Sequence, residues 1–191
     1  MRKLSYYIAL SIDGFIAAPD GSYDFYPLSD ELFGFMGSDF PEALPTPARQ
    51  ALGVDGVPNR RYDTVLMGRG TYEPGIKAGM TSPYAHLRQI VFSRSLGESP
   101  DPAVEVVSGD PVPLVRALKQ EEGADIYLCG GADLAGQLVD EIDELVVKSY
   151  PIVMGAGIPL FRTEFMPRSF VPTGSRSFEN GTVVTTYARK R

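Results

Sequence analysis

Short apolar runs alternate with amphipathic segments along most of the chain. Runs rich in β-branched and aromatic residues predict strands at residues 3–10, 63–67, 89–93, 104–107, 125–129 and 144–150. Their nearly continuous apolar character is typical of strands covered on both faces, as in a parallel sheet. In residues 111–123 and 132–142 the apolar positions recur at helical spacing, and Gly123 is placed to end the first of these helices. The alternation predicts one α/β domain over residues 1–191 with right-handed crossovers.

Two regions depart from this alternation. Asn180-Gly181 separates two strand-like runs and predicts an antiparallel hairpin with a two-residue turn, so we expect a mixed sheet. Residues 19–62 are rich in proline, glycine and aromatic residues, and predict short helices near 29–37 and 46–52 joined by irregular chain. Long segments of this kind are usually lids or binding loops. Their aromatic residues are candidates for a substrate wall, core packing or a dimer contact: Phe25, Tyr26, Phe33, Phe35 and Phe40.

Composition and charge argue against several classes of protein for this chain. The net charge is −6 without a basic block, which argues against nucleic acid as a partner. No apolar run reaches the roughly 18 residues of a membrane-spanning helix, and the first apolar run predicts a strand rather than a secretion signal. A single cysteine, Cys129, leaves no internal disulfide and suits a reducing cytoplasm. With one histidine, His86, which we expect on a surface helix, no metal site is predicted.

The stretch from Gly68 to Thr71 follows the end of a predicted strand. Gly68 and Gly70 allow a sharp turn and bring backbone amides close to a ligand, Arg69 can bind phosphate through paired hydrogen bonds, and Thr71 lies where a helix would begin. A strand-to-helix turn with glycine and threonine is also common for structural reasons alone. This stretch taken by itself favours a phosphate site and an ordinary turn about equally.

Two further strand ends carry groups that favour anions. Gly130-Gly131 follows the strand of residues 125–129 and precedes a helix, where free amides favour a pyrophosphate. Ser93, Arg94 and Ser95 follow another strand and suit a phosphate monoester. The carboxyl ends of parallel strands form a ligand-binding edge, and two or three phosphates on one ligand are what NADP offers. The glycines do not match the Rossmann G-x-G-x-x-G pattern.

Four stretches in this order, ALSIDGFIA, VLMGRGTYE, IVFSRSL and IYLCGGADLAGQLV, resemble the dihydrofolate reductase superfamily over nearly the whole chain. The later PIVMGAGIPLF resembles more specifically the reductase domain at the C-terminal end of bifunctional riboflavin-biosynthesis deaminase-reductases and its stand-alone relatives. The resemblance implies a three-layer fold with a mostly parallel mixed sheet flanked by helices. It also implies an NADPH-dependent oxidoreductase acting on a small molecule, and a homodimer.

The same resemblance assigns residues to the cofactor. Gly68, Arg69, Gly70 and Thr71 would hold its phosphates, and Ser93 and Arg94 would grip the adenosine 2′-phosphate, which implies NADPH over NADH. The pyrophosphate and nicotinamide side would be wrapped by Gly130, Gly131, Ala132, Asp133 and Leu134, while the backbone of Ala9 and Ile16 would contact the nicotinamide amide. Residues 17–23 match a mobile loop that closes over the nicotinamide and excludes water.

The catalytic acid is less well defined by the sequence. Dihydrofolate reductases place a carboxylate on the helix after the mobile loop, and Asp30 is the best match, with Glu31 adjacent. An acid in the first turn of a helix capped by Ser29 is also favoured by the helix dipole alone. Asp13 is expected mainly to stabilise the turn at Gly14, and is a minor candidate because the matching Asp-Gly lies near substrate in the riboflavin-type relatives.

Departures from the family pattern leave alternatives open. The chain lacks the His-x-Glu and Cys-x-x-Cys of a zinc deaminase, so a role in riboflavin biosynthesis would be reduction only, like that of 5-amino-6-(5-phosphoribosylamino)uracil reductase. Phe15 stands where riboflavin reductases often carry a base, so a substrate phosphate would need Arg49, Arg60 or Arg61, which are otherwise expected to be solvated. Pterin reduction and a non-catalytic dinucleotide-binding role remain the alternatives.

Overall fold

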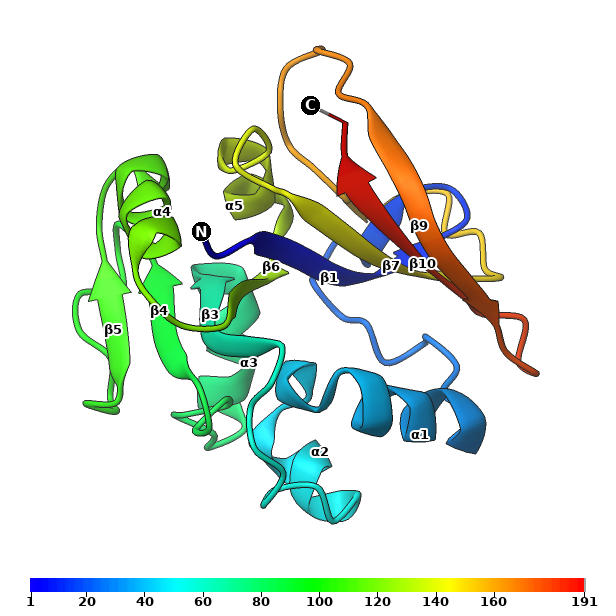
Figure 1. Ribbon diagram of the computed structural model, residues 1–191, viewed down its shortest axis with the longest axis horizontal. Coiled ribbons are helices and arrows are strands. Elements are labelled where there is room, and N and C mark those ends of the chain that lie inside the picture. The colour runs from blue at the N-terminus through cyan, green and yellow to red at the C-terminus, as the bar shows by residue number, and fades with distance from the viewer. Residues whose placement is uncertain (191) are drawn as a thin grey trace.

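The computed structural model describes residues 1–190, and its framework is an open, twisted sheet (Figure 1). Within the described residues the sheet has eight strands in the order β5-β4-β3-β6-β1-β7-β10-β9. The strands are β1 Leu4–Ser11, β3 Tyr62–Gly68, β4 Arg88–Phe92, β5 Val104–Val107, β6 Asp125–Gly130, β7 Glu144–Tyr150, β9 Phe170–Ser177 and β10 Val183–Arg189. The short strands β2 Phe15–Ala17 and β8 Ile158–Pro159 pair beside it. Each of the six strands expected from apolar runs is present.

Strand direction follows from the connections. The strands from β5 to β7 are parallel, whereas β10 is antiparallel to both β7 and β9. This confirms the predicted mixed, mostly parallel sheet with a C-terminal hairpin. The hairpin connection is longer than the predicted two-residue turn, because the last paired residues are Ser177 and Val183. Phe178 is buried in the core at the start of the connection, and Gly181 supplies the positive φ of 79° that its turn requires.

Helices cover both faces of the sheet (Figure 1). They are α1 Asp30–Asp39, α2 Thr46–Ala51, α3 Arg69–Lys77, α4 Pro111–Gln120 and α5 Ala132–Gln137, with a 3₁₀ turn at Pro41–Ala43. Buried residues of α4 and α5 pack with one face, around Leu4, Leu66 and Leu128. Residues of α1, α2 and α3 pack with the other face, around Tyr7 and Met67. Because side chains alternate across a strand, the continuous apolar runs supply both cores, and the result is the predicted three-layer arrangement.

Two helices end earlier than their apolar spacing predicted. Helix α4 stops at Gln120, and Gly123 lies beyond it in a loop, where a Cβ would come within 2.4 Å of a carboxylate oxygen of Asp63. Helix α5 stops at Gln137, yet Leu138 and Ile142 are fully buried. The chain continues through successive turns that keep these side chains on the core side. Apolar spacing therefore identified the buried face but not the helix end.

The segment of residues 19–62 contains α1, the 3₁₀ turn and α2, close to the expected short helices, joined by irregular chain. Ser29 caps α1 by accepting a hydrogen bond from the Leu32 amide. Phe40 is buried against Tyr7, with ring centroids 4.9 Å apart, and Phe35 packs against Phe40 and Phe178. Core packing thus accounts for Phe35 and Phe40. Tyr26 and Phe33 pack against the same core and also line the cavity described below.

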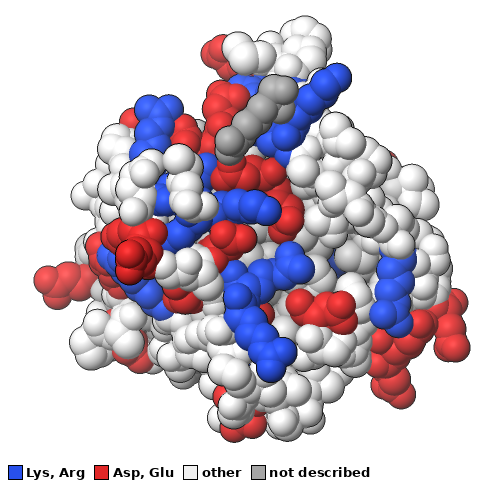
Figure 2. Space-filling model, viewed as in Figure 1, with Lys and Arg blue, Asp and Glu red and all other residues white. Residues whose placement is uncertain are grey.

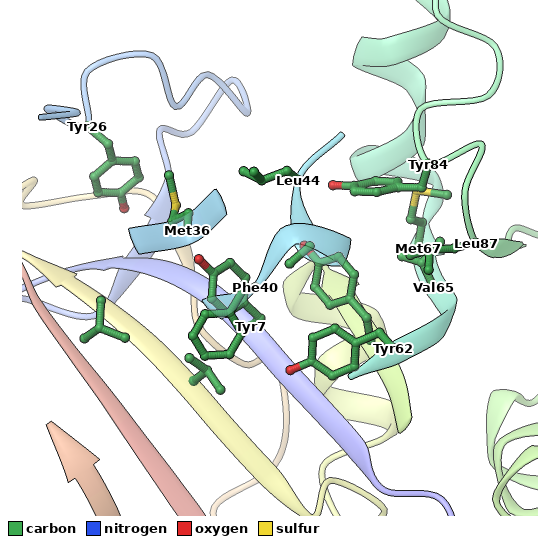
Figure 3. Packing of buried hydrophobic residues seen from close by; sticks show 14 of the residues in the cluster. Tyr7, Tyr26, Met36, Phe40, Leu44, Tyr62, Val65, Met67, Tyr84 and Leu87 are labelled. Carbon is green, nitrogen blue, oxygen red and sulfur yellow. The ribbon is translucent and has the colours of Figure 1, made fainter. Parts of the chain in front are cut away.

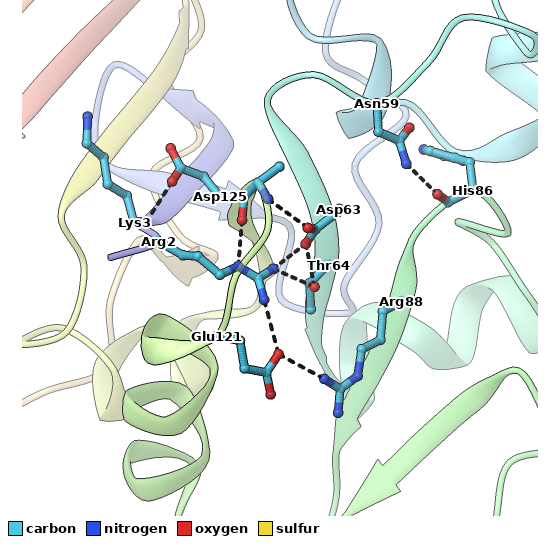
Figure 4. A network of polar contacts seen from close by, with 10 residues as sticks. Arg2, Lys3, Asn59, Asp63, Thr64, His86, Arg88, Glu121 and Asp125 are labelled. Atoms are coloured by element: carbon cyan, nitrogen blue, oxygen red, sulfur yellow. Dashed lines mark hydrogen bonds and ion pairs between the residues drawn. The ribbon is translucent and has the colours of Figure 1, made fainter.

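A network of charged side chains joins the amino ends of the parallel strands (Figure 4). Arg2, with a side chain only 4% exposed, pairs with Asp63 and Glu121 and donates to the hydroxyl of Thr64 at 2.7 Å. Arg88 shares Glu121 at 3.4 Å. The guanidinium of Arg2 therefore has partners from β3 and from the end of α4, and we call Arg2, Asp63, Thr64, Arg88 and Glu121 the amino-edge network.

On the face shown in Figure 2, basic and acidic side chains are interspersed. A basic stripe of the kind that tracks a phosphate backbone is not seen on that face. Among residues 1–190 no helix is long and apolar enough to cross a membrane.

Candidate active site

A cavity of about 830 Å³ opens at the carboxyl ends of the central strands, between the sheet and the segment containing α1 and α2. Two groups of lining residues differ in chemistry. The first, from the ends of β3, β4 and β6 and the helices that follow, is called the glycine–arginine half: Gly68, Arg69, Gly70, Thr71, Ser93, Arg94, Ser95, Gly131, Ala132, Asp133 and Leu134. The second, from β1, β2, β6, β7, the helical segment and the turn before β4, is called the tyrosine–lysine half: Tyr7, Ala9, Ile16, Tyr26, Phe33, Met36, Leu44, Tyr84, Tyr127, Cys129 and Lys148.

Glycines bring the ends of β3 and β6 close together in the glycine–arginine half. A Cβ on Gly68 would lie 3.4 Å from the Gly131 nitrogen, and a Cβ on Gly131 would lie 3.6 Å from the Thr71 hydroxyl. The strands pair through Met67 and Gly130, so both turns open on the same side of the sheet. The structure thus brings together two of the three strand ends that the sequence singled out. Of the residues assigned to the cofactor, Gly130 alone does not line the cavity.

The third strand end supplies hydroxyl and guanidinium groups. Ser93 is nearly buried, and its Oγ accepts from the Ser95 and Leu96 amides at 3.2 and 3.0 Å, which fixes the turn after β4. Arg69 reaches across from α3 and donates to Ser95 Oγ at 2.7 Å. Arg94 is exposed at this end of the cavity, and no carboxylate among the described residues pairs with it. An unpaired guanidinium beside a cavity suits an anionic ligand group.

Helices α3 and α5, which begin in the glycine–arginine half of the cavity, lack side-chain caps. Helices α3 and α5 start after Gly68 and Gly131, and no side chain accepts from their first amides. By contrast, Ser29 caps α1, and Asp110 caps α4, whose first residue Pro111 also borders the cavity. The first amides of a helix need partners, and at α3, a helix of nine residues, they face the cavity. This arrangement leaves donors available to a bound anion.

The start of α5 is held in place by the chain around Arg162. The Arg162 amide donates to the Ala132 carbonyl at 3.0 Å, and its guanidinium pairs with Asp133 at 3.2 Å. A Cβ on Gly136 would come within 1.9 Å of the Arg162 carbonyl oxygen, so only glycine permits this approach. Asp133 is thus paired with an arginine at the cavity wall, and it is the only carboxylate among the described lining residues.

The tyrosine–lysine half is mostly apolar with phenol groups (Figure 3). The ring of Tyr127 lies between those of Tyr7 and Tyr84, with ring centroids 6.1 Å and 5.8 Å away respectively. The Tyr84 hydroxyl lies 3.3 Å from Cys129 Sγ. Burial raises the pKa of each of these tyrosines well above its usual value. The Tyr7 hydroxyl is buried without a hydrogen-bond partner among the described residues. An orphaned polar atom beside a cavity is a sign that a ligand group completes the site.

Lys148 is the one cation in this half of the cavity among the described residues. Its Nζ lies 4.0 Å from the centre of the Tyr7 ring, and no described carboxylate forms a salt bridge with it. Burial lowers the pKa of Lys148 from 10.5 to about 8. Lys148 was not among the site residues predicted from the sequence. Its only signal there is a charged residue inside the apolar strand ELVVKSY.

The two acids expected at the catalytic position do not line the cavity. Asp30 is exposed in the first turn of α1, where Leu32, Phe33 and Met36 occupy the inner face instead. Asp13 is exposed and accepts from the Ser11 hydroxyl at 2.6 Å and from the Met154 and Gly155 amides. The Ser11 hydrogen bond, with those backbone amides, lowers the pKa of Asp13 to about 2. Asp13 therefore ties the turn after β1 to residues 154–155. The turn at Gly14, which Asp13 was expected to stabilise, is instead closed by Ser11, whose carbonyl accepts from the Gly14 amide and whose Oγ accepts from the Phe15 amide.

The remaining candidates are distributed as follows. Arg49 was expected to be solvated or to bind a substrate phosphate, but it is buried and donates to the Val57 carbonyl at 2.8 Å. Arg61 pairs with Glu144 and lies over the Phe40 ring, and neither it nor Arg60 lines the cavity. His86 was expected on a helix, and this was wrong. It lies in a turn before β4, where Nε2 is 3.0 Å from the Glu42 carbonyl.

Charge in the cavity opposes the charge of the whole chain. The protein carries a net charge of −6, yet the charged lining residues are Arg69, Arg94, Lys148 and Arg162 against Asp133 alone. Low-dielectric walls concentrate such a field and favour an anionic ligand. The residues from 17 to 23, expected to form a loop over the nicotinamide, border the same cavity through Gly21 and Tyr23.

Comparison with known proteins identifies the family. The model of the RibD C-terminal domain matches residues 2–184, so the chain belongs to that family. The chain is 34% identical to the uncharacterized protein YwjB of Bacillus subtilis (strain 168) over 84% of this chain and 83% of that protein. It is 25% identical to the uncharacterized protein YyaP of the same organism over 97% and 94% of the two chains.

Solved structures agree with this fold. A putative riboflavin biosynthesis protein from Shewanella sp. PV-4 superposes with a TM-score of 0.76 at 26% identity, covering 99% of both chains. The Thermotoga maritima diaminohydroxyphosphoribosylaminopyrimidine deaminase/5-amino-6-(5-phosphoribosylamino)uracil reductase superposes at 0.65 and 16% identity, over 99% of this chain and 57% of that one. Enterococcus faecalis dihydrofolate reductase complexed with NADP(H) superposes at 0.63 and 16% identity, over 99% and 97%. The fold is therefore dihydrofolate reductase-like.

Proposed function

We propose that this member of the RibD C-terminal domain family is an NADPH-dependent reductase of the riboflavin type, acting on a small heterocyclic or ribosylamino substrate. The observation that carries the proposal is the meeting of three strand ends on one cavity. Gly68–Thr71, Ser93–Arg94 and Gly131–Leu134 line it together, although 63 positions separate Gly68 from Gly131 in the sequence. Family membership supports an oxidoreductase.

The residues of the glycine–arginine half fit a dinucleotide with several phosphates. The uncapped amides of α3 and the Thr71 hydroxyl would take the pyrophosphate, and Arg69 beside them would add charge. Ser93 and the unpaired Arg94 would hold a 2′-phosphate, which is the group that distinguishes NADPH from NADH. Ala9 and Ile16 would contact the nicotinamide amide where β1 ends.

The tyrosine–lysine half would receive the substrate ring. NADPH, when bound, supplies the hydride for an electrophilic C=N or C=O carbon. The protein's part is to orient the substrate between the sheet and the α1–α2 segment, exclude water and provide one proton. In the riboflavin-type reaction a ribosylamino-pyrimidine would become its ribitylamino product. In the alternative reaction a pterin ring would be reduced. Dihydrofolate reductases use a carboxylate for this, and none of the described residues that line this half of the cavity carries one.

A second function, non-catalytic dinucleotide binding, is favoured by one observation. Asp30, the acid expected from the resemblance, is exposed and outside the cavity lining. Turnover separates the two functions, because both require NADPH binding and only the reductase oxidises NADPH when a substrate is added.

The test begins with binding. Isothermal titration of the wild-type protein with NADPH and NADH should give a dissociation constant of tens of micromolar or below for NADPH, corresponding to about −6 kcal/mol or better. The variant Arg94→Ala should weaken NADPH about tenfold and leave NADH nearly unchanged, since only NADPH carries the 2′-phosphate. Equal losses for both cofactors would contradict the assignment of Arg94.

Turnover is then measured as NADPH oxidation at 340 nm with a panel of ribosylamino-pyrimidines and pterins. Oxidation with a ribosylamino-pyrimidine supports the riboflavin-type reaction, and oxidation with pterins alone supports the alternative. NADPH binding without oxidation of any compound would favour the non-catalytic role. If neither nucleotide binds at tens of micromolar, the reductase proposal fails.

We also propose a homodimer in a reducing cytoplasm. The edge strand β9 has a mostly exposed surface, and exposed apolar side chains lie on it or just before it at Phe165, Met166 and Val171. An uncovered edge with apolar side chains is a suitable surface for a second copy of the chain. Light scattering after size exclusion would give twice the mass of 20.8 kDa if the dimer forms, and 20.8 kDa if it does not. The compartment rests on the single cysteine, Cys129.

A further inference from the structure

We infer that the ε-ammonium of Lys148 donates the proton that completes the reduction in this cavity, an inference that rests on the reductase function proposed above. Lys148 lies in the middle of β7, opposite Ala9 of β1. Ala9 is the residue proposed to contact the nicotinamide amide, so Lys148 lies on the strand next to the proposed hydride donor. Both residues line the cavity.

The reaction leaves a place for such a group. When a hydride adds to the carbon of a C=N or C=O bond, the electron pair of that bond moves to nitrogen or oxygen. That atom then takes a proton from the Lys148 ammonium: an N–H bond of lysine breaks and an N–H or O–H bond of the product forms. The neutral amine regains its proton from water. Electrons and protons balance without any further reactant.

Lys148 is held without a partner that would fix its charge. Its Nζ lies 4.0 Å from the Tyr7 ring centre, and no described carboxylate pairs with it. The titratable groups around it are the phenol of Tyr7 on β1, the thiol of Cys129 on β6 and the phenol of Tyr150 two residues along β7. Burial raises the pKa of all three, so these neighbours are neutral near pH 7. Asp39 of α1 contributes to raising the pKa of Tyr7 and forms no salt bridge with Lys148.

Other groups are less suited to the role. The tyrosines that line this half have pKa values raised by burial, which makes them weaker acids than usual. Asp133 is paired with Arg162 in the other half, and Asp13 and Asp30 lie outside the lining. Burial lowers the pKa of Lys148 to about 8, close to the pH at which a donor both holds its proton and releases it readily. Lys148 is therefore the described group that combines access to the cavity with suitable acidity.

Two substitutions separate proton donation from charge alone. Lys148→Met removes the ammonium and keeps an unbranched chain, whereas Lys148→Arg keeps a positive charge that does not lose its proton. Lys3→Met is the matched control, because Lys3 is exposed at the opposite edge of the sheet. With NADPH and the best compound of the ribosylamino-pyrimidine and pterin panel, kcat should fall about 100-fold or more in both Lys148 variants and stay unchanged in Lys3→Met. NADPH affinity, measured by titration calorimetry, should change less than about threefold, because Lys148 lies outside the glycine–arginine half.

The pH profile gives a signature that a structural role would not produce. The wild-type kcat should be constant below about pH 7 and fall through the pKa of about 8, and this decline should be absent from Lys148→Met. A second readout needs neither cofactor nor substrate. In NMR titration of ¹³Cε-labelled lysine, one resonance should titrate near pH 8, and it should be missing from Lys148→Met but present in Lys3→Met.

The outcomes separate this inference from the proposed function. Wild-type turnover that persists in Lys148→Met, or is restored by Lys148→Arg, overturns proton donation and leaves the reductase intact. Titration of every lysine near pH 10.5 overturns it as well. A wild-type protein that binds no NADPH, or binds it and reduces none of the panel, overturns the reductase function and the inference with it.

Discussion

At the amino ends of the parallel strands, charged side chains pair with other side chains of the protein, whereas toward the carboxyl ends two of the cavity's charged side chains have no carboxylate partner among the described residues. Arg2 contacts Asp63, Thr64 and Glu121, and its side chain is 4% exposed. Across the sheet, Arg94 and Lys148 line the cavity and pair with no carboxylate among the described residues. The sheet therefore uses charged groups to hold its amino edge together (Figure 4), and leaves charged groups available to a ligand at its carboxyl edge.

The largest expected effect on folding is at the amino edge. Arg2→Met would leave Asp63 and the Ala124 carbonyl without the guanidinium that they now share. Breaking a buried ion pair on one side costs about 3–5 kcal/mol, and because Asp63 is partly exposed we expect about 2–3 kcal/mol. Urea denaturation would measure it. NADPH affinity should be unchanged, and a stable variant with weakened NADPH binding would contradict the division between the edges.

Lys148→Met should change the free energy of unfolding in the opposite direction and stabilise the protein. Burial lowers the pKa of Lys148 from 10.5 to about 8, so its charged form destabilises the folded protein. That cost is fully present below pH 8 and disappears as pH rises toward 10.5, where the lysine is neutral in both states. We expect Lys148→Met to be more stable than wild type by up to about 2 kcal/mol at pH 7, and by much less near pH 10. Urea denaturation at both values tests this, and a destabilised variant at pH 7 would show that Lys148 supports the fold.

Arg69→Ala should weaken NADPH much more than it weakens substrate. Arg69 lies in the glycine–arginine half, and its guanidinium, half-exposed itself, contacts the exposed Ser95 and the half-buried Glu73, so the fold loses little. Loss of a charged hydrogen bond corresponds to about 1.5–3 kcal/mol, or roughly tenfold or more in the NADPH dissociation constant. Titration calorimetry measures it, with Arg88→Ala at the amino edge as the control. An unchanged NADPH affinity would reduce the Gly68–Thr71 stretch to an ordinary turn.

Asp30→Asn should have the smallest effect. Asp30 is exposed in the first turn of α1, where Ser29 already caps the helix. Loss of the favourable dipole interaction costs about 0.3–1 kcal/mol in stability, and kcat should change less than about twofold. A large fall in kcat, measured by NADPH oxidation, would restore Asp30 as the catalytic acid expected from the resemblance.

The residues of the glycine–arginine half of the cavity could be predicted from the sequence, whereas the role of Lys148 in the tyrosine–lysine half could not. Gly68–Thr71, Ser93–Arg94 and Gly131 each follow a strand directly, so local spacing and parallel topology together predict that they meet. Lys148 lies inside a strand, and its surroundings come from Tyr7 and Cys129, distant in sequence. No local sequence pattern indicates that these three side chains lie close together in the fold. Asp30 was misleading for the same reason, because a first-turn acid has the same sequence pattern whether it faces a cavity or solvent.

Some features of the fold could likewise be predicted from the sequence and others could not. Six strands of the sheet were predicted from apolar runs. A strand that is buried on both faces needs such a run, so the run is visible in the sequence. Strand β8 is only Ile158–Pro159, too short to leave a pattern, and it depends on pairing with β2. Helices α4 and α5 end at Gln120 and Gln137, before their apolar spacing ends, and the close approach of Arg162 to Gly136 within α5 leaves no apolar signal in the sequence. Local periodicity does not contain that information.

A crystal structure with NADP⁺ bound would show directly whether the three strand ends hold one dinucleotide. We expect the pyrophosphate at Gly68–Thr71 and Gly131, the 2′-phosphate at Ser93–Arg94, and the nicotinamide beside Ala9 with an open space next to Lys148. A nucleotide bound outside the cavity, or bound with its 2′-phosphate away from Arg94 and its nicotinamide away from Ala9, would contradict it.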